Sequence, residues 1–309
     1  MPKGKVVGTT QRVGQKLKRE VGLTWRYVFN LGPSLAYRRS KQRPAGEAAR
    51  VADDMAREGV AVTTVRALFG SDDRLRDLQA AAATLEEVHA DELEAARRSV
   101  DVGATGEKTY LVRLLGDIAT AEPRSPWARL ALSPELRGVA NAYFGMATQV
   151  RDYNVWRNLQ TLTQPRESQL WHRDWREDHF VVKAFVYLED VDEGRGPFTY
   201  LPGTHVRGRR RLLPETTVEG HHLRSTDEQI EAVAPRSEWR QVTGPAGTIV
   251  LADTTGYHKG GWARTGDRLL YTCLYGSQAG VKRHRLRIGP DLRVEEHDPE
   301  TVFALDLAR

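Results

Sequence analysis

The sequence predicts a mainly β protein with flanking helices, in which a double-sheet jelly roll is supported by helices from the N-terminal half. Helical spacing and glycine caps dominate up to about residue 145. Short segments rich in Val, Tyr, Phe, Thr and Leu follow, separated by turn residues, which is typical of a β-sandwich or barrel. A long polar stretch at about 206–240 interrupts them, and an insertion of that size in a compact domain is typically a lid.

The N-terminal half is expected to hold two main helices and one short strand. Residues 44–59 carry apolar side chains at helical spacing, and Gly59 suits the C-cap position. A strand and turn follow at 60–70. Ser71 is the expected N-cap of a helix that runs to Arg98, because acids fill its first turn and arginines its last.

The second half is expected to supply the strands of the jelly roll. β-Branched and aromatic residues favour extended structure where one face of a strand is buried. The expected strands cover residues 148–163, 168–175, 179–191, 196–205, 247–255 and 267–276. The predicted organisation is a basic arm at 1–43, one catalytic domain at 44–290 with an α-rich part at 44–145 and a β core at 146–290, and a tail at 291–309.

Composition places the chain among ordinary globular proteins. A hydrophobic content of 40% and a charged content of 28% are average values, and no segment reaches the ~18 apolar residues that span a bilayer. The N-terminus lacks the apolar core of a secretory signal. With Cys273 as its single cysteine, the chain can form no internal disulfide. We therefore expect a cytoplasmic protein.

The N-terminal arm is strongly basic. Residues 1–50 hold twelve Lys or Arg and two acids, an excess of ten that exceeds the net charge of +5 of the whole chain. Such an arm suits nucleic acid, anionic lipid or an acidic carrier protein, but a solvated leader is the simpler interpretation. Nucleic-acid binding is disfavoured because no recognition fold accompanies the charge. Aromatic and aliphatic residues at 21–35 indicate that this part packs on the body.

A metal site is the strongest chemical signal. His172 and Asp174 stand two residues apart in an expected strand, so their side chains project from one face. His258 follows the expected strand at 247–255 and is the candidate third ligand. Two histidines and one carboxylate on one face of a metal form the facial triad of non-haem Fe(II) oxygenases. A surface histidine with a capping aspartate is the alternative for the first pair alone.

The open positions of such a metal would suit a bidentate 2-oxo acid and dioxygen, and 2-oxoglutarate also needs a cation for its distal carboxylate. Arg268, ten residues after His258 at the start of an expected strand, is preferred over Arg264, which lies in a glycine-bounded turn. The expected 2-oxoglutarate-binding residues are Arg268, Thr272, Asn158 and Gln160.

These features together resemble the phytanoyl-CoA dioxygenase family. The resemblance rests on HRD at 172–174, PFTYLPGTH at 197–205, His258 and Arg268 in this order, and it extends over roughly residues 45–290. It implies a double-stranded β-helix, cupin-like core, Fe(II) held by His172, Asp174 and His258, and coupling of 2-oxoglutarate decarboxylation by dioxygen to substrate oxidation. The sequence departs from the family pattern at Gly260, where a small polar residue is common, and in its basic arm.

The resemblance also bears on the reaction and the substrate. Halogenating relatives replace the carboxylate ligand with a small residue, so Asp174 implies hydroxylation, ring closure or desaturation instead. Candidate substrate-binding residues are Trp171, Trp175, His179, His205, Arg207, Tyr257 and Trp262. A small molecule of bacterial specialised metabolism, sugar-like or anionic, is the expected substrate. The alternatives are a non-catalytic, cupin-like metal-binding module and a basic nucleic-acid-binding protein. The sequence does not indicate the oligomeric state.

Overall fold

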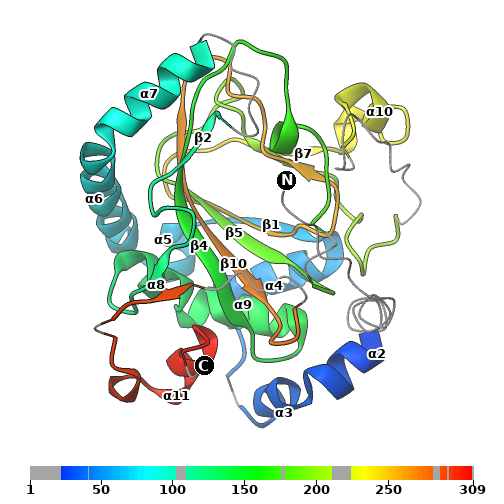
Figure 1. Cartoon of the computed structure of the whole chain (residues 1–309). Coiled ribbons are helices and arrows are strands. Elements are labelled where there is room, and N and C mark those ends of the chain that lie inside the picture. Colours follow the sequence, from blue (N-terminus) through cyan, green and yellow to red (C-terminus); the bar gives the residue numbers. More distant parts are fainter. Residues whose placement is uncertain are drawn as a thin grey trace, which may run out of the picture.

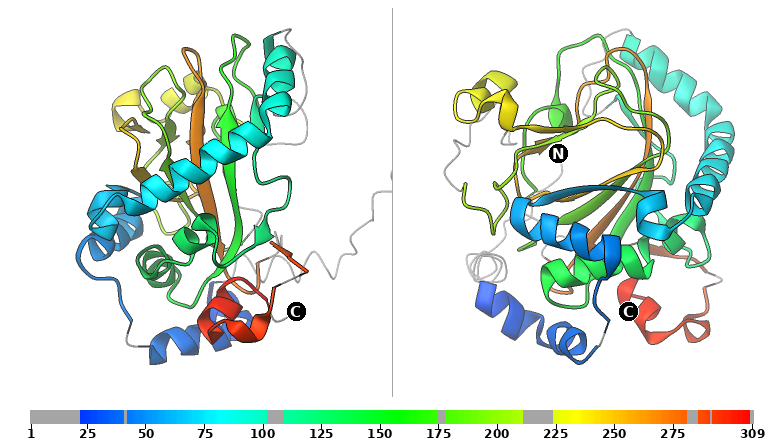
Figure 2. Two further views of the ribbon diagram at one scale, coloured as in Figure 1. Left: turned by 90° about the vertical axis from the view of Figure 1, so that its left-hand side faces the viewer. Right: turned by 180° about the vertical axis from the view of Figure 1, so that it is seen from behind.

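Two β-sheets form the centre of the protein, and helices cover the outer face of the larger one (Figures 1 and 2). The structure is a computed structural model, and it describes residues 22–40, 42–101, 109–174, 178–210, 224–280, 286–290 and 292–307. Among these residues, none of the helices combines the length and apolar character needed to cross a bilayer.

The larger sheet contains strands from both halves of the chain, each antiparallel to its neighbours. Its strands, in spatial order, are β1 (Val60–Thr64), β8 (Thr248–Asp253), β5 (Val182–Tyr187), β10 (Arg268–Gly276), β4 (Gln149–Asn158) and β2 (Leu111–Arg113). Because β1 belongs to the α-rich part of the sequence but lies at an edge of this sheet, the two parts share one core.

The smaller sheet faces the larger one and contains the candidate ligand His258. It contains β7 (Arg240–Val242), β6 (Phe198–Tyr200) and β9 (His258–Lys259). Single bridges extend it from His258 to His172 and from Trp171 to Ser225. The two facing antiparallel sheets confirm the predicted jelly roll. A short parallel pair, β3 (Thr120–Ala121) and β11 (Arg287–Ile288), lies apart from both.

Helices pack on the outside of the larger sheet and along its edge (Figure 1). The longer ones are α4 (Gly46–Glu58), α6 (Asp73–Val88), α7 (Ala90–Asp101) and α9 (Pro134–Phe144). The shorter ones are α2 (Gly22–Thr24), the π-helix η1 (Trp25–Phe29), α3 (Leu31–Arg39), α5 (Val65–Phe69), α8 (Pro126–Ala131), η2 (Glu167–Gln169), α10 (Asp227–Glu231), η3 (Arg236–Glu238), η4 (Val294–Glu296) and α11 (Pro299–Ala304).

Strand alternation gives the larger sheet two different faces. On β10, Leu269 and Tyr271 point outward into the main hydrophobic core beneath the helices. Arg268, Leu270 and Thr272 have the opposite parity and line a cavity between the sheets. The outer face therefore supplies the core, while the inner face is available for a site.

Two expected elements differ in the structure. The helix expected from Ser71 to Arg98 is divided at His89, whose backbone leaves helical geometry, into α6 and α7. The segment 168–175 forms no continuous strand, because only Trp171 and His172 pair, each through an isolated bridge. Within the polar insertion, α10 and η3 are described, whereas residues 211–223 lie outside the described part of the chain.

The N-terminal segment packs on the body mainly through Trp25, and Arg26 and Asn30 add hydrogen bonds with Phe144 and Ala279. Trp25 is buried, and its indole Nε1–H donates a hydrogen bond of 2.8 Å to the Asp178 carboxylate. Tyr27, Val28 and Leu31 are exposed instead, so the expected packing holds for Trp25 and is wrong for these three. Residues 1–21 of the predicted basic arm lie outside the described residues.

Two glycines with the same backbone conformation allow a test of packing around the sheets. Gly59 and Gly70 both follow helices with φ near 79° and 78°. A Cβ at Gly59 would lie 2.5 Å from atoms of His205 and Tyr200, whereas a Cβ at Gly70 meets nothing within 4 Å. We expect Gly70→Ala to lower the free energy of unfolding by about 1 kcal/mol, from left-handed strain alone. Gly59→Ala should lower it by a further ~1–3 kcal/mol, measured by urea denaturation. Equal losses would contradict this packing.

Candidate metal centre

Backbone pairing brings the two candidate histidine ligands together. The His172 N–H donates to the His258 carbonyl at 2.9 Å, and the His258 N–H donates to the His172 carbonyl at 3.0 Å. The two residues are therefore directly opposite, and their ring centroids lie 4.2 Å apart. The Asp174 N–H donates to the Thr254 carbonyl at 2.8 Å, which holds the carboxylate beside the same pair.

The three side chains present a suitable set of metal donors. One ligand atom from each of His172, Asp174 and His258 lies within 4.8 Å of the others. The Nδ1 atoms contact backbone carbonyls, that of His172 with Leu170 at 2.8 Å and that of His258 with Gly256 at 3.0 Å. These contacts favour the tautomer that leaves Nε2 as the ligand atom, as is usual for metal-binding histidine. The residues therefore fit an iron ion.

A lysine from the larger sheet pairs with the candidate carboxylate ligand. Lys183 on β5 donates from Nζ to Asp174 Oδ2 at 2.7 Å, and His258 Nε2 lies 3.6 Å from the same oxygen. Burial acts to raise the pKa of Asp174, but the Lys183 ammonium, His258 and His172 outweigh it and hold that pKa well below its usual range. The carboxylate is therefore ionised and ready to bind a cation.

Both histidines are held neutral. Burial, followed by the proximity of His258, places the pKa of His172 well below its ordinary value. Burial also lowers the pKa of His258, although Asp174 acts in the opposite direction. A neutral imidazole is the form that binds a metal, so the histidines need not lose a proton at neutral pH.

A buried guanidinium lies in the same cavity. Arg268 begins β10, and its Nη2 donates to the Gly260 carbonyl at 3.0 Å. Its Nε and Nη1 atoms are buried without a hydrogen-bond partner among the described residues. Burial lowers the pKa of Arg268, opposed by the neighbouring Tyr187 hydroxyl. Since buried donors are costly to leave unpaired, this guanidinium fits the carboxylate of a bound molecule.

The cavity that joins these groups is large enough for a cosubstrate and a small molecule. Its volume is about 380 Å³, and its lining includes the three candidate metal ligands and Arg268. Trp156, Phe185 and Phe198 supply aromatic walls. A metal triad, an anchoring cation and an apolar wall in one cavity are the parts that a 2-oxoglutarate oxygenase needs.

Comparison with known proteins decides the family. Residues 56–269 match the family described as phytanoyl-CoA dioxygenase, PhyH. The chain belongs to the phytanoyl-CoA dioxygenase family. This confirms the enzyme class predicted from the sequence, a non-haem iron oxygenase with Fe(II) as its metal and 2-oxoglutarate and dioxygen as its cosubstrates. No curated protein sequence gives a significant match to the chain.

Solved structures show the same fold at low sequence identity. EctD from S. alaskensis, crystallised with 2-oxoglutarate and 5-hydroxyectoine, is 20% identical with a TM-score of 0.51, over 85% of this chain and 86% of that one. AviO1 from Streptomyces viridochromogenes Tue57 is 21% identical with a TM-score of 0.50, over 77% and 99%. The carbocyclase SnoK from nogalamycin biosynthesis is 19% identical with a TM-score of 0.51, over 83% and 94%.

Within this PhyH chain, the structure separates the residues expected to bind 2-oxoglutarate. Arg268, Thr272 and Asn158 line the cavity, and Thr272 Oγ1 accepts a hydrogen bond from Trp156 at 2.9 Å. Gln160 does not line it, because its amide donates to the Arg264 carbonyl at 2.6 Å. Arg264 is exposed, whereas Arg268 is buried.

The six described residues that were expected to bind substrate are not part of the cavity lining. Trp171 and Tyr257 pack in a small apolar cluster with Ile230, and Trp171 donates to Asp227 at 2.8 Å. Trp262 Nε1 donates to the Thr161 carbonyl at 2.7 Å.

The other expected contacts also lie elsewhere. His179 packs against Trp25, and His205 packs beside Gly59. Arg207 donates to the Tyr143 carbonyl at 2.6 Å. These three side chains make their contacts elsewhere, so the structure does not place them at the candidate metal centre. Trp175 lies outside the described residues.

Three basic residues of the cavity lining were not predicted from the sequence. Lys183, Arg113 and Arg224 all line the cavity. Lys183 could have been found, because it is a charged residue at the same strand parity as Phe185 within an apolar strand. Arg113 and Arg224 lie in short or irregular segments, where the sequence shows no alternation from which the direction of a side chain can be predicted.

The lowered histidine pKa values predict a pH dependence of stability. As pH falls through the ordinary histidine pKa near 6.5, the unfolded chain takes up protons that buried His172 and His258 exclude. The free energy of unfolding of the metal-free protein should therefore fall by up to ~1 kcal/mol per histidine per pH unit below that point. The variant His172→Gln/His258→Gln should show a flatter profile in urea denaturation. Parallel profiles would show that these histidines do not exclude protons.

Proposed function

We propose that this oxygenase oxidises a C–H bond of a small molecule, by hydroxylation, ring closure or desaturation. The observation that carries the proposal is the convergence of His172, Asp174 and His258 with buried Arg268 in one cavity. The retained carboxylate of Asp174 favours C–H oxidation over halogenation. Bound Fe(II) supplies the coupling between decarboxylation of 2-oxoglutarate by dioxygen and oxidation of the substrate.

Each residue has a distinct role in this proposal. His172, Asp174 and His258 hold iron from one side and leave its other positions open. Arg268 pairs with the distal carboxylate of 2-oxoglutarate through its two buried donors. The aromatic walls exclude water from the reacting atoms and hold an apolar part of the substrate.

The substrate is proposed to be anionic or sugar-like and to belong to bacterial specialised metabolism. Four cationic side chains line the cavity against two acidic ones, Asp152 and Asp174. The cations are Arg113, Lys183, Arg224 and Arg268. Fe(II) and the 2-oxoglutarate dianion nearly cancel, so this excess favours a negative or hydroxyl-rich substrate. A cytoplasmic location and recruitment by an acidic carrier protein stay predictions.

The metal and cosubstrate roles are tested by anaerobic titration of the purified protein with Fe(II) and then 2-oxoglutarate. We expect the visible charge-transfer absorption of the Fe(II)–2-oxoglutarate complex in the native protein and its loss in Asp174→Ala. Asp77→Ala, which removes an exposed carboxylate from outer helix α6, is the control. Iron binding without the absorption would favour a non-catalytic metal-binding module. Absence of both would remove the oxygenase proposal.

Two nearby arginines provide a matched test of the cosubstrate anchor. Arg268→Ala should weaken 2-oxoglutarate binding by ~10–100-fold, because it removes charge-assisted hydrogen bonds worth about 1.5–3 kcal/mol. Arg264→Ala, at an exposed position, should leave the dissociation constant unchanged. The same absorption measures both variants. A larger loss with Arg264→Ala would assign the anchor to that residue.

A further inference from the structure

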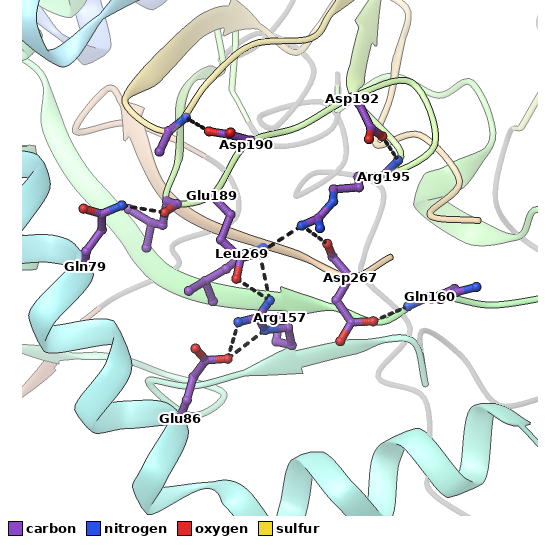
Figure 3. Close-up of polar contacts among 12 residues, drawn as sticks. Gln79, Glu86, Arg157, Gln160, Glu189, Asp190, Asp192, Arg195, Asp267 and Leu269 are labelled. Carbon is purple, nitrogen blue, oxygen red and sulfur yellow. Dashed lines mark hydrogen bonds and ion pairs between the residues drawn. The ribbon is translucent and has the colours of Figure 1, made fainter. Parts of the chain in front are cut away.

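Figure 3 shows a partly buried ion network around Arg157. Arg157 is paired with Leu269, so its side chain lies on the face of the larger sheet opposite the cavity. It belongs to β4 and is 9% exposed. Arg157 Nε donates to Glu86 at 2.8 Å, and Nη1 donates to both oxygens of Glu189 at 3.0 and 2.9 Å. Glu86 belongs to α6, so the network ties an outer helix to the sheet.

The network holds the residue that follows the anchor. Glu189 Oε2, besides accepting from Arg157, accepts the Leu269 backbone N–H at 3.2 Å (Figure 3). The Leu269 carbonyl accepts the Leu188 N–H at 3.1 Å. Both backbone groups of Leu269 are therefore fixed at the point where β10 begins.

The residue that precedes the anchor is fixed as well. The Asp267 carboxylate pairs with Arg97 of α7 at 2.6 Å and accepts the Gln160 N–H at 2.7 Å. The Asp267 carbonyl accepts from Arg195 at 3.2 Å. Arg268 thus lies between two residues that are held from outside the cavity.

The anchor itself is held weakly by comparison. Its guanidinium donates to the Gly260 carbonyl, but its Nε and Nη1 atoms have no hydrogen-bond partner among the described residues. Since consecutive side chains of a strand point to opposite faces, fixing Asp267 and Leu269 outside sets where Arg268 points inside. A displacement of about 1 Å in a group that positions a reactant can lower the reaction rate by about 100-fold.

We propose that Glu189, oriented by Arg157, is a positioning residue for the 2-oxoglutarate anchor Arg268. The proposal rests on the proposed function, because it assigns Arg268 to the distal carboxylate. Arg157 and Glu189 touch neither metal nor cosubstrate. They act by holding the backbone at the start of β10. The Arg268 guanidinium is then already in position before 2-oxoglutarate binds.

The test compares two 2-oxo acids that differ in the group Arg268 would bind. Pyruvate has the metal-binding 2-oxo acid end but no distal carboxylate. Anaerobic Fe(II)-loaded protein is titrated with each acid, and the absorption gives both dissociation constants. We expect Glu189→Ala and Arg157→Met to weaken 2-oxoglutarate binding on the order of tenfold, while pyruvate and Fe(II) binding are unchanged. Glu189→Gln keeps an oxygen for the Leu269 N–H and should restore most of the loss.

Two controls separate positioning from a general loss of structure. Arg137→Met removes a similarly buried arginine that pairs with Glu300 of α11, and it should change neither constant. In the background of Arg268→Ala, adding Glu189→Ala should not weaken 2-oxoglutarate binding any further, because Glu189 acts through Arg268.

The outcomes are distinguishable from those that test the function. If the native protein forms the 2-oxoglutarate complex but Glu189→Ala weakens both acids equally, or adds its full effect to Arg268→Ala, the positioning role is overturned and the function stands. If the native protein forms no complex, the function and this inference fall together. The positioning role is supported if Glu189→Ala selectively weakens 2-oxoglutarate binding in the native background but causes no further loss in the Arg268→Ala background.

Discussion

The reciprocal hydrogen bonds between the backbones of His172 and His258 are the interaction on which the site depends. They join two chain segments separated by more than eighty residues and place both imidazoles on one side of the smaller sheet. The pairing lies outside any long strand, so its position is set by the neighbouring β6 and by the bridge at Trp171. The candidate metal site therefore depends on how these distant segments pair, and not on one local motif.

The grouping of His172, Asp174 and His258 was predicted from the sequence, and the structure brings the three side chains together. The spacing of His172 and Asp174 predicts a shared side, and the order of motifs along the chain places His258 and Arg268 after them. The aromatic residues next to the triad were assigned wrongly to the cavity. Trp171 and Tyr257 directly precede His172 and His258, so alternation directs them to the opposite side, where they pack against Ile230.

The larger sheet assigns different tasks to its two faces. Inward residues of β10 include the proposed anchor Arg268 and part of the cavity wall, while outward ones share a core with α4, α8 and α9. The ion network around Arg157 is a third arrangement, since it uses charge where most of that outer face uses apolar packing. Burial acts to lower the pKa of Arg157, but Glu189 and Glu86 raise it overall, so the ion pairs persist. Long-range pairing of this kind has no local signature in the sequence.

The contact between Trp25 and Asp178 has a consequence for where the folded unit begins. Asp178 is buried, and its carboxylate also accepts the Ser277 N–H at 2.7 Å. The Trp25 ring lies 5.2 Å from that of Phe180 and 6.1 Å from that of Phe144. A chain that began at residue 44 would lack Trp25 and expose the rings of Phe144 and Phe180. It would also remove one hydrogen-bond donor from the buried carboxylate of Asp178, four residues from Asp174. The packing of Trp25 therefore makes residues ahead of position 44 part of the folded unit.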